Sequence, residues 1–207
     1  MAAPASKTVR DLNGKWVLNK TLSDPTDPAL ALQGVGWLLR KGIGAATITI
    51  TVKQYVDSST STGTTTIEID QSASGLSSTK EMRRLDWTAR EHKDFVFGRV
   101  DGRSKYISAA ELAALVAPEG EARKQGWVDS DFLALDWLPE GGEGGEGEGD
   151  GGASYVLNHV DADGGWCATQ VWGFQEIGGE RRYVRNVVVA KGEQFESFKM
   201  IYDFVSE

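Results

Sequence analysis

The sequence predicts an all-β, mainly antiparallel fold: a single domain, residues 1–207, built as an up-and-down barrel of ten strands. Segments in which apolar and polar residues alternate recur along the chain, separated by turns that contain Gly, Ser or Asp. Between these segments the sequence shows no helix long enough to connect parallel strands. The chain also begins and ends on a strand-like segment. Pairing those two segments would close the sheet and remove its exposed edges.

The first strand is expected at "KWVLNKT", next to Gly14 and Trp16. A tryptophan this close to a chain end is unexpected, because termini usually fray. An indole buries a large area when it is packed. We therefore expect Trp16 to be structural and to plug one end of the barrel.

A helix-turn-helix lid is predicted over residues 27–44. Asp27 is expected to cap the first helix, with Pro28 at the first helical position, and apolar residues then follow at helical spacing. Gly34 and Gly36 interrupt that spacing. Because glycine ends helices at low cost, we expect two short helices joined by a tight turn.

The longest run of alternation is "ATITITVKQYV", and further strands follow it to residue 107. Residues 108–154 break this rhythm and are predicted to be an insertion. Ser108 and Glu111 have capping-box spacing, which predicts a helix at "SAAELAALV". Residues 141–152 consist of Gly, Glu and Asp, so we expect a flexible surface loop there. Four strands then complete the barrel.

Composition limits the possible functions. The chain has 30 acidic and 22 basic residues and a net charge of −8, which argues against nucleic acid as a partner because phosphate binding needs a cationic surface. The single cysteine, Cys167, excludes an internal disulfide and indicates a reducing, cytoplasmic location. No segment has the apolar length of a membrane span, so we expect no stable membrane insertion.

Catalytic motifs are not evident. His92 and His159 have no neighbours at metal-ligand spacing, so neither a metal site nor a cofactor is expected. His92 lies among charged residues in "LDWTAREHKD" and is either a general base or part of a solvated turn. His159 follows the alternation of its strand and is either an inward acid or base or an ordinary core histidine.

Several motifs in this order resemble those of the intracellular fatty-acid-binding proteins, within the lipocalin-like (calycin) group. They are "LNGKW", with Gly14 and Trp16; the lid segment "QGVGWLLRK"; and "VVVAKGEQFESFKMIYDF", with Tyr202. The resemblance covers residues 11–107 and 155–204 and leaves the insertion outside. It implies a barrel with an internal cavity under the lid. It also implies that the basic lid residues Arg40 and Lys41 make transient contact with a membrane, although on an acidic protein two cations more often form a solvated face.

One departure from the family concerns the ligand. The last strand of the family often carries Arg-x-Tyr, which holds a carboxylate, whereas this chain has Met200, Ile201 and Tyr202. Arg185 is a candidate replacement, and a surface charge opposite Glu176 or Glu180 is the alternative. By strand alternation and by resemblance, the predicted ligand-binding residues are Trp37, Tyr155, His159, Gln170, Trp172, Phe174, Arg185, Phe198, Met200 and Tyr202.

Three functions follow from these observations. The first is binding, transport or sequestration of a hydrophobic small molecule, such as a lipid or lipid-like metabolite, inside the barrel. The second is a cyclase or isomerase of small-molecule metabolism that needs no metal or cofactor and uses the same cavity, because orientation alone can supply much of a rate. The third is a protein-interaction module built on the acidic insertion.

Overall fold

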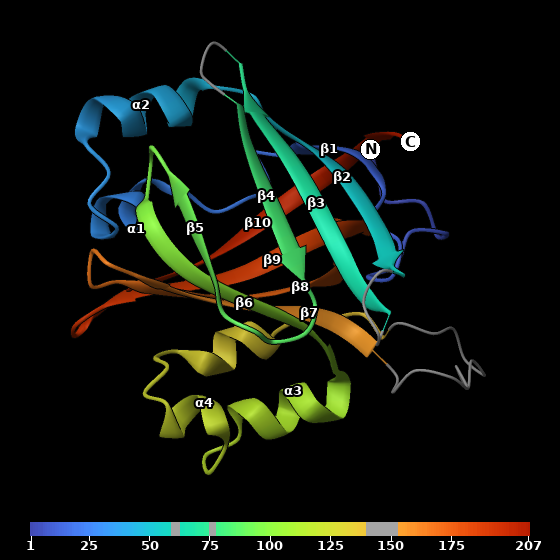
Figure 1. Ribbon diagram of the computed structural model, residues 1–207. Helices are drawn as coiled ribbons and strands as arrows, with labels where there is room; N and C mark the ends of the chain where they lie inside the picture. The colour runs from blue at the N-terminus through green and yellow to red at the C-terminus, as the bar shows by residue number, and fades with distance from the viewer. Residues whose placement is uncertain (59–62, 75–77, 140–152) are drawn as a thin grey trace.

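The computed structural model describes residues 1–58, 63–74, 78–139 and 153–207, apart from the side chains of Asp94 and Ala153. Ten strands form one antiparallel sheet in the order β4-β3-β2-β1-β10-β9-β8-β7-β6-β5. Because β1 pairs with β10, the sheet curls into a nearly closed barrel, as predicted (Figure 1). The strands are β1 (Gly14–Leu18), β2 (Ile48–Asp57), β3 (Thr64–Ala73), β4 (Ser78–Arg84), β5 (Arg90–Asp94), β6 (Gly98–Ser108), β7 (Ala153–Ala162), β8 (Cys167–Ile177), β9 (Glu180–Lys191) and β10 (Gln194–Ser206).

Two short helices, α1 (Asp27–Leu32) and α2 (Trp37–Ala45), form the predicted helical pair. Gly34, between them, has a φ of 85°, a conformation that residues with a side chain rarely adopt. The predicted cap is wrong: Asp27 is already helical and Thr26 is the N-cap residue. The Asp27 carboxylate instead accepts a hydrogen bond of 2.5 Å from Arg40, which ties α1 to α2. None of the helices in the described part of the chain is long and apolar enough to cross a membrane.

The end of the barrel opposite these helices is closed by the N-terminal segment, and both chain termini lie there (Figure 1). Trp16 is fully buried; its indole N–H donates to the carbonyl oxygen of Leu12 at 2.9 Å, and its ring lies 4.9 Å from that of Phe204. The structure thus agrees with a structural role for Trp16. We call this end the filled half, defined by the buried residues Ala3, Val9, Leu12, Trp16, Ile50, Val52, Ile67, Ile69, Val156, Trp172, Phe174, Tyr183 and Tyr202.

The end of the barrel beneath α1 and α2 is not completely filled. Ala29 of α1 packs with Trp166 and with residues of β6 to β10, and together they enclose space. We call this end the hollow half, defined by Ala29, Val100, Val160, Trp166, Ala168, Val187, Val189 and Phe198.

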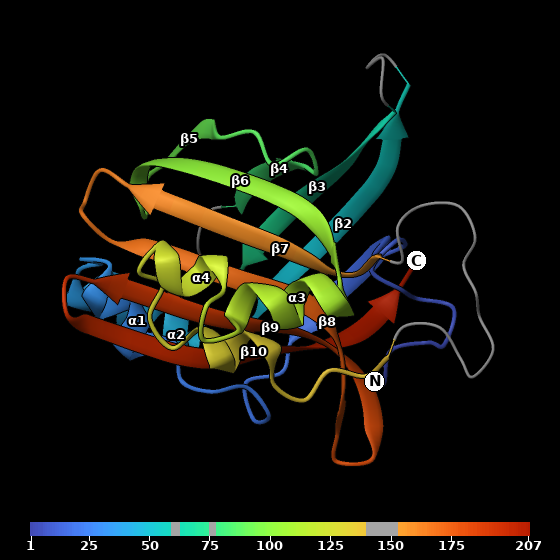
Figure 2. The ribbon, with the colours of Figure 1, turned by 90° about the horizontal axis from the view of Figure 1, so that it is seen from below.

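The insertion folds onto the outside of the barrel. It contains α3 (Ala109–Val116), α4 (Glu121–Lys124) and a 3₁₀ helix η1 (Ser130–Ala134), which lie over the outer face of β7 to β9 (Figure 2). The predicted capping box of α3 is confirmed, because the Glu111 N–H donates to Ser108 Oγ and the Ser108 N–H donates to Glu111. Asn186 on β9 donates to the carbonyl oxygens of Phe132 and Leu135 and so anchors the insertion. The predicted loop at residues 141–152 lies outside the described residues.

Candidate functional site

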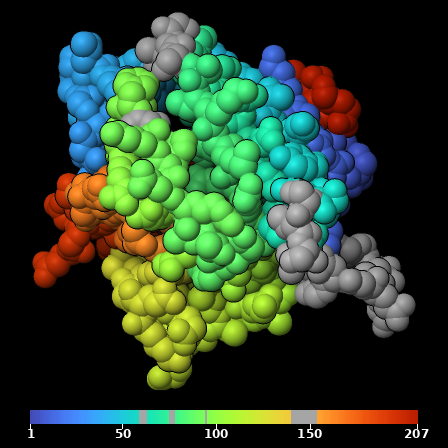
Figure 3. Space-filling model, viewed as in Figure 1, coloured from blue at the N-terminus to red at the C-terminus, as the bar shows by residue number. Residues whose placement is uncertain are grey.

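The hollow half holds a cavity of about 220 Å³. Its wall is mainly apolar, and it opens near the lid, where the molecular surface is hollowed between α2, β4 and β5 (Figure 3). α1 and α2 contribute Leu30, Leu39 and Ile43, and the turn between β5 and β6 contributes Phe97. An apolar cavity with a few polar groups is the usual form of a small-molecule site.

Arg185 is the principal polar group of this cavity. Although only 7% exposed, it lines the cavity wall. Its Nε donates to the Tyr183 hydroxyl at 2.9 Å, and its guanidinium stacks 4.0 Å from the ring centroid of Trp172. Among the described residues, Nη2 of Arg185 has no hydrogen-bond partner. The guanidinium is thus held in place with one donor still available.

The position of Arg185 follows from strand register. Residue 185 on β9 lies directly opposite Met200 on β10, the position at which the related family carries its arginine. In this chain the positive charge thus lies on the strand next to position 200, and both side chains line the same cavity. The alternative of a surface charge opposite Glu176 or Glu180 is wrong, because Arg185 is buried.

Two tyrosines support Arg185 from the filled half. Burial raises the pKa of Tyr183 to about 12, and it also raises the pKa of Tyr202. Both phenols therefore stay neutral at physiological pH, and the Tyr202 ring lies 5.1 Å from the Arg185 guanidinium. Because neutral phenols do not form an ion pair with the guanidinium, its positive charge can still interact with another group in the cavity.

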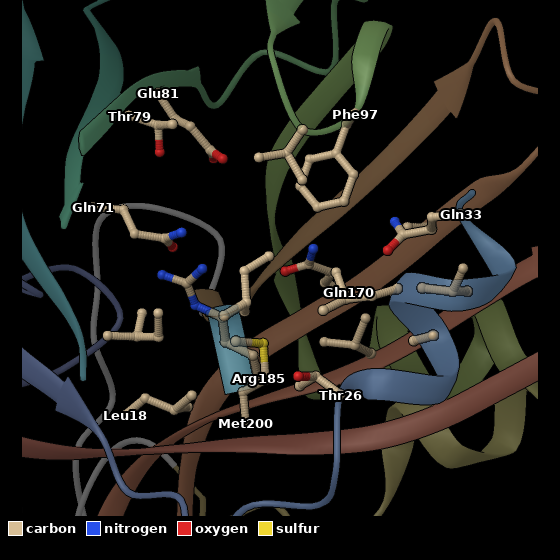
Figure 4. Close-up of a pocket in the computed structure, with 18 of the residues that line it drawn as sticks. Leu18, Thr26, Gln33, Gln71, Thr79, Glu81, Phe97, Gln170, Arg185 and Met200 are labelled. Carbon is tan, nitrogen blue, oxygen red and sulfur yellow. The ribbon is translucent and has the colours of Figure 1, made fainter. Parts of the chain in front are cut away.

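The opposite wall carries an ion pair on β4, where Arg83 donates to Glu81 at 2.8 Å. The Arg83 charge holds the pKa of Glu81 below its usual value. Figure 4 shows Glu81 and Thr79 on this wall, with the Arg185 guanidinium and the Gln71 amide facing the same space. The cavity therefore presents polar and charged groups on two facing walls, Arg185 on one and the Glu81–Arg83 pair on the other, within a lining that is mainly apolar.

The structure brings together five of the ten predicted site residues. Gln170, Trp172, Arg185, Phe198 and Met200 all line the cavity. Their inward orientation follows the alternation along β8, β9 and β10. Contact between these residues and a ligand stays a prediction.

The other five lie elsewhere. Trp37 is 64% exposed at the start of α2. Phe174 and Tyr202 are packed in the filled half. Tyr155 and His159 are on the outer face of β7, beneath the insertion, where Tyr155 packs against Trp137. The insertion makes this outer face apolar as well, so alternation alone could not distinguish it from the inner face.

His159 has the environment of a core histidine. Its ring stacks on Trp127 with centroids 4.5 Å apart, and Nδ1 lies 2.8 Å from the hydroxyl of Thr169. Burial lowers its pKa below the ordinary value, and the nearby Asp161 carboxylate opposes that effect. The imidazole therefore fastens the insertion to the barrel and does not face the cavity.

Sequence reasoning missed the β4 wall and the turn that follows β5. Glu81 and Arg83 lie within "TKEMRR", where a run of charges is typical of a solvated face, and only strict alternation from Thr79 indicates that they share a side. Gln71 was missed because it is the polar residue that continues the alternation of Ile67 and Ile69 on β3. Phe97 was missed because it lies in the turn after β5, where alternation gives no orientation.

Solved structures of the same fold come from several animals. The lipid-binding protein 8 of Caenorhabditis elegans has a TM-score of 0.52 at 11% identity, covering 93% of this chain and 94% of that one. A fatty-acid-binding protein of Drosophila melanogaster brain has a TM-score of 0.51 at 12% identity, covering 91% and 95%. The likeness to these structures shows the fold, a nearly closed antiparallel barrel like that of the fatty-acid-binding proteins.

Sequence relatives identify a narrower group. A protein named probable pericyclase scpY, from Mollisia scopiformis, is 30% identical over 205 residues, which cover 99% of this chain and 95% of that protein. Pericyclase pydY from an Acremonium species is 26% identical over 206 residues, which cover 99% and 97%. The chain belongs to the family of scpY. No family model matches it.

Proposed function

We propose that this protein is a pericyclase-type enzyme that folds an apolar, unsaturated small molecule in its cavity and promotes ring closure. The observation that carries the proposal is Arg185, a buried guanidinium in the wall of a mainly apolar cavity, with one donor that has no partner among the described residues. The names of the two relatives support the same activity.

Ring closure of this type makes modest chemical demands. In a cycloaddition, two π bonds are consumed and two σ bonds form within one molecule, so no proton, electron or leaving group has to be handled. The barrier is largely that of holding a flexible chain in the reactive conformation, and a site that orients the two reacting ends lowers this part of the barrier. A rigid apolar cavity beneath a lid supplies such orientation.

Arg185 would act on the electronic part of the barrier. A carbonyl conjugated to the reacting double bond accepts a hydrogen bond from Nη2, which withdraws electron density and favours attack by the diene. The guanidinium is already fixed by Tyr183 and Trp172. Little reorganisation is then needed when the substrate binds, and Gln71 or Gln170 supplies a second polar contact in the same cavity.

The second candidate function is a carrier that binds or sequesters a hydrophobic ligand unchanged. The mainly apolar wall and the helical lid favour it, because burial of apolar area provides affinity of roughly 25 cal/mol per Å² without any chemistry. The cytoplasmic location and transient membrane contact through the lid also stay proposals. The exposed Trp37 and Leu38 on α2 support the membrane contact.

The test uses a linear probe that carries a conjugated diene at one end and an α,β-unsaturated ketone at the other. Its cyclised isomer has the same mass and is separated by chromatography. We expect the protein to accelerate closure above the rate in buffer. We expect Arg185→Met to lower that acceleration roughly 10- to 100-fold, the effect of losing one hydrogen bond to a charged group.

The matched control is Arg123→Met, which removes an exposed arginine from α4 on the outer insertion and should leave the rate unchanged. Quenching of tryptophan emission reports binding separately, because Trp172 lines the cavity. Binding of the probe with no acceleration would reject the enzyme and favour the carrier. Equal rates for the wild type and Arg185→Met would remove Arg185 from the mechanism.

A further inference from the structure

The barrel has one seam, at the two ends of the sheet. β4 and β5 are the terminal strands in the sheet order, and β4 lies alongside β6 without ladder pairing in the described part of the chain. Side chains bridge the seam. A Cβ at Gly102 on β6 would lie 2.9 Å from Nη1 of Arg83, so the absence of a side chain there makes room for that guanidinium.

A second cavity, of about 330 Å³, lies at this seam. In contrast to the cavity in the hollow half, its lining is largely charged. It includes three arginines, two glutamates and a histidine: Arg83, Arg84, Arg90, Glu81, Glu91 and His92. Such a lining suits a polar group and not an apolar chain.

The ion pairs at the seam leave positive charge in excess. Arg90 is matched by two hydrogen bonds to Asp86, of 2.7 and 2.6 Å, and Glu91 accepts from Arg99 at 2.7 Å. Glu81 is matched by Arg83. Arg84 forms no ion pair with any carboxylate that the structure describes, and Nε of Arg83 is buried with no partner among the same residues. These donors favour an anion, in a chain whose net charge is −8.

The two cavities share a wall, since Glu81 and Arg83 line both. We propose that the seam cavity binds an oxyanion, such as a carboxylate, at one end of an elongated ligand. The apolar body of that ligand lies in the cavity of the hollow half, which we call the main cavity. This inference rests on the proposed function only in requiring that the main cavity holds an apolar ligand.

The experiment compares two fluorescent probes, cis-parinaric acid and its methyl ester, which differ only in the charge at one end. We expect the wild type to bind the acid about fivefold more tightly than the ester, the effect of one partly exposed ion pair. Arg84→Gln should abolish that preference and leave ester binding unchanged. The preference should also shrink as salt is raised from 0.05 to 0.5 M, because screening weakens the ion pair.

The matched control is Lys80→Gln, which removes the same charge from the same strand but outside either cavity lining, and should keep the acid preference. Equal binding of acid and ester by the wild type would overturn the seam site and leave the main cavity standing. If Arg185→Met lost the acid preference while Arg84→Gln kept it, the seam site would also be overturned. The oxyanion would then lie in the cavity of the hollow half. Binding of neither probe would reject both the seam site and the apolar ligand.

Discussion

The two halves of the barrel are built from the same strands, but one half is packed with side chains and the other encloses a cavity. β8 places Phe174 in the filled half and Ala168 in the hollow half, and β9 places Tyr183 and Val187 in the same way. At one end aromatic rings pack on one another, with Trp16 and Tyr183 5.3 Å apart. At the other end the wall residues, among them Ala168 and Val187, leave a cavity between them.

This difference shows that stability and binding are separated along one set of strands. The filled half excludes water and resembles an ordinary core, where lost volume is costly. The hollow half gives up packing to keep space for a ligand. Arg185 lies at the boundary, with Tyr183 and Tyr202 behind it and the cavity in front.

The largest effect that we expect comes from removing the aromatic plug. Trp16→Ala deletes a fully buried indole together with its contacts to Tyr183 and Phe204. It should lower the free energy of unfolding by about 3–5 kcal/mol, measured by urea denaturation. Trp37→Ala is the control, since this exposed indole should change stability by less than about 0.5 kcal/mol. Similar losses from both variants would contradict the division into halves.

A pair of identical substitutions tests the two halves directly. Val156→Phe adds volume to the filled half and should cost about 1–3 kcal/mol of stability through overpacking. Val187→Phe adds the same volume next to the cavity and should cost less, because the ring can enter free space. Val187→Phe should instead weaken binding of cis-parinaric acid at least about tenfold by filling the site, as fluorescence titration would show. If Val156→Phe weakened binding as much, the cavity would extend into the filled half.

The smallest effect concerns the outer wall. Burial lowers the pKa of His159 in the folded state, so above pH 6.5 the imidazole is neutral whether the chain is folded or unfolded. As the pH falls below 6.5 the unfolded chain binds the proton first, and stability should decrease until the folded-state pKa is reached. Asp161, Arg103, Thr169 and Trp127 are the groups around the ring.

The measurement is urea denaturation at pH 8 and pH 5.5 for the wild type and for His159→Gln. The variant should lose less stability between the two pH values than the wild type, because the titrating group is gone. Binding of cis-parinaric acid should stay the same in both proteins at pH 8, since His159 lies outside the cavity. An identical pH dependence in both proteins would show that His159 does not titrate on unfolding.

Much of the fold could be predicted because strand alternation and turn residues are local signals. The pairing of β1 with β10, the two lid helices and the α3 capping box all follow from such signals. The packing of the insertion could not be predicted, because it depends on contacts such as Asn186 to Phe132, between residues far apart in sequence.

The site was predictable only in part, for a related reason. Alternation identifies which residues of a strand share a face. It placed Gln170 and Trp172 together on β8, and Phe198 and Met200 together on β10. It does not reveal which face is the interior when both are covered, as at Tyr155. Nor does alternation reveal where along the barrel the cavity begins. Gln170 and Phe174 share a face of β8, but only Gln170 lines the cavity.

The offset of Arg185 from position 200 has a practical consequence for the choice of chemical probes. Neighbouring strands lie about 4.8 Å apart, so the backbone of residue 185 is displaced sideways by about that distance from the backbone of residue 200. A compound posed for a cation on the last strand would be anchored on the wrong strand. A useful screening library should therefore be aligned on the cation of β9 and not on the terminal strand.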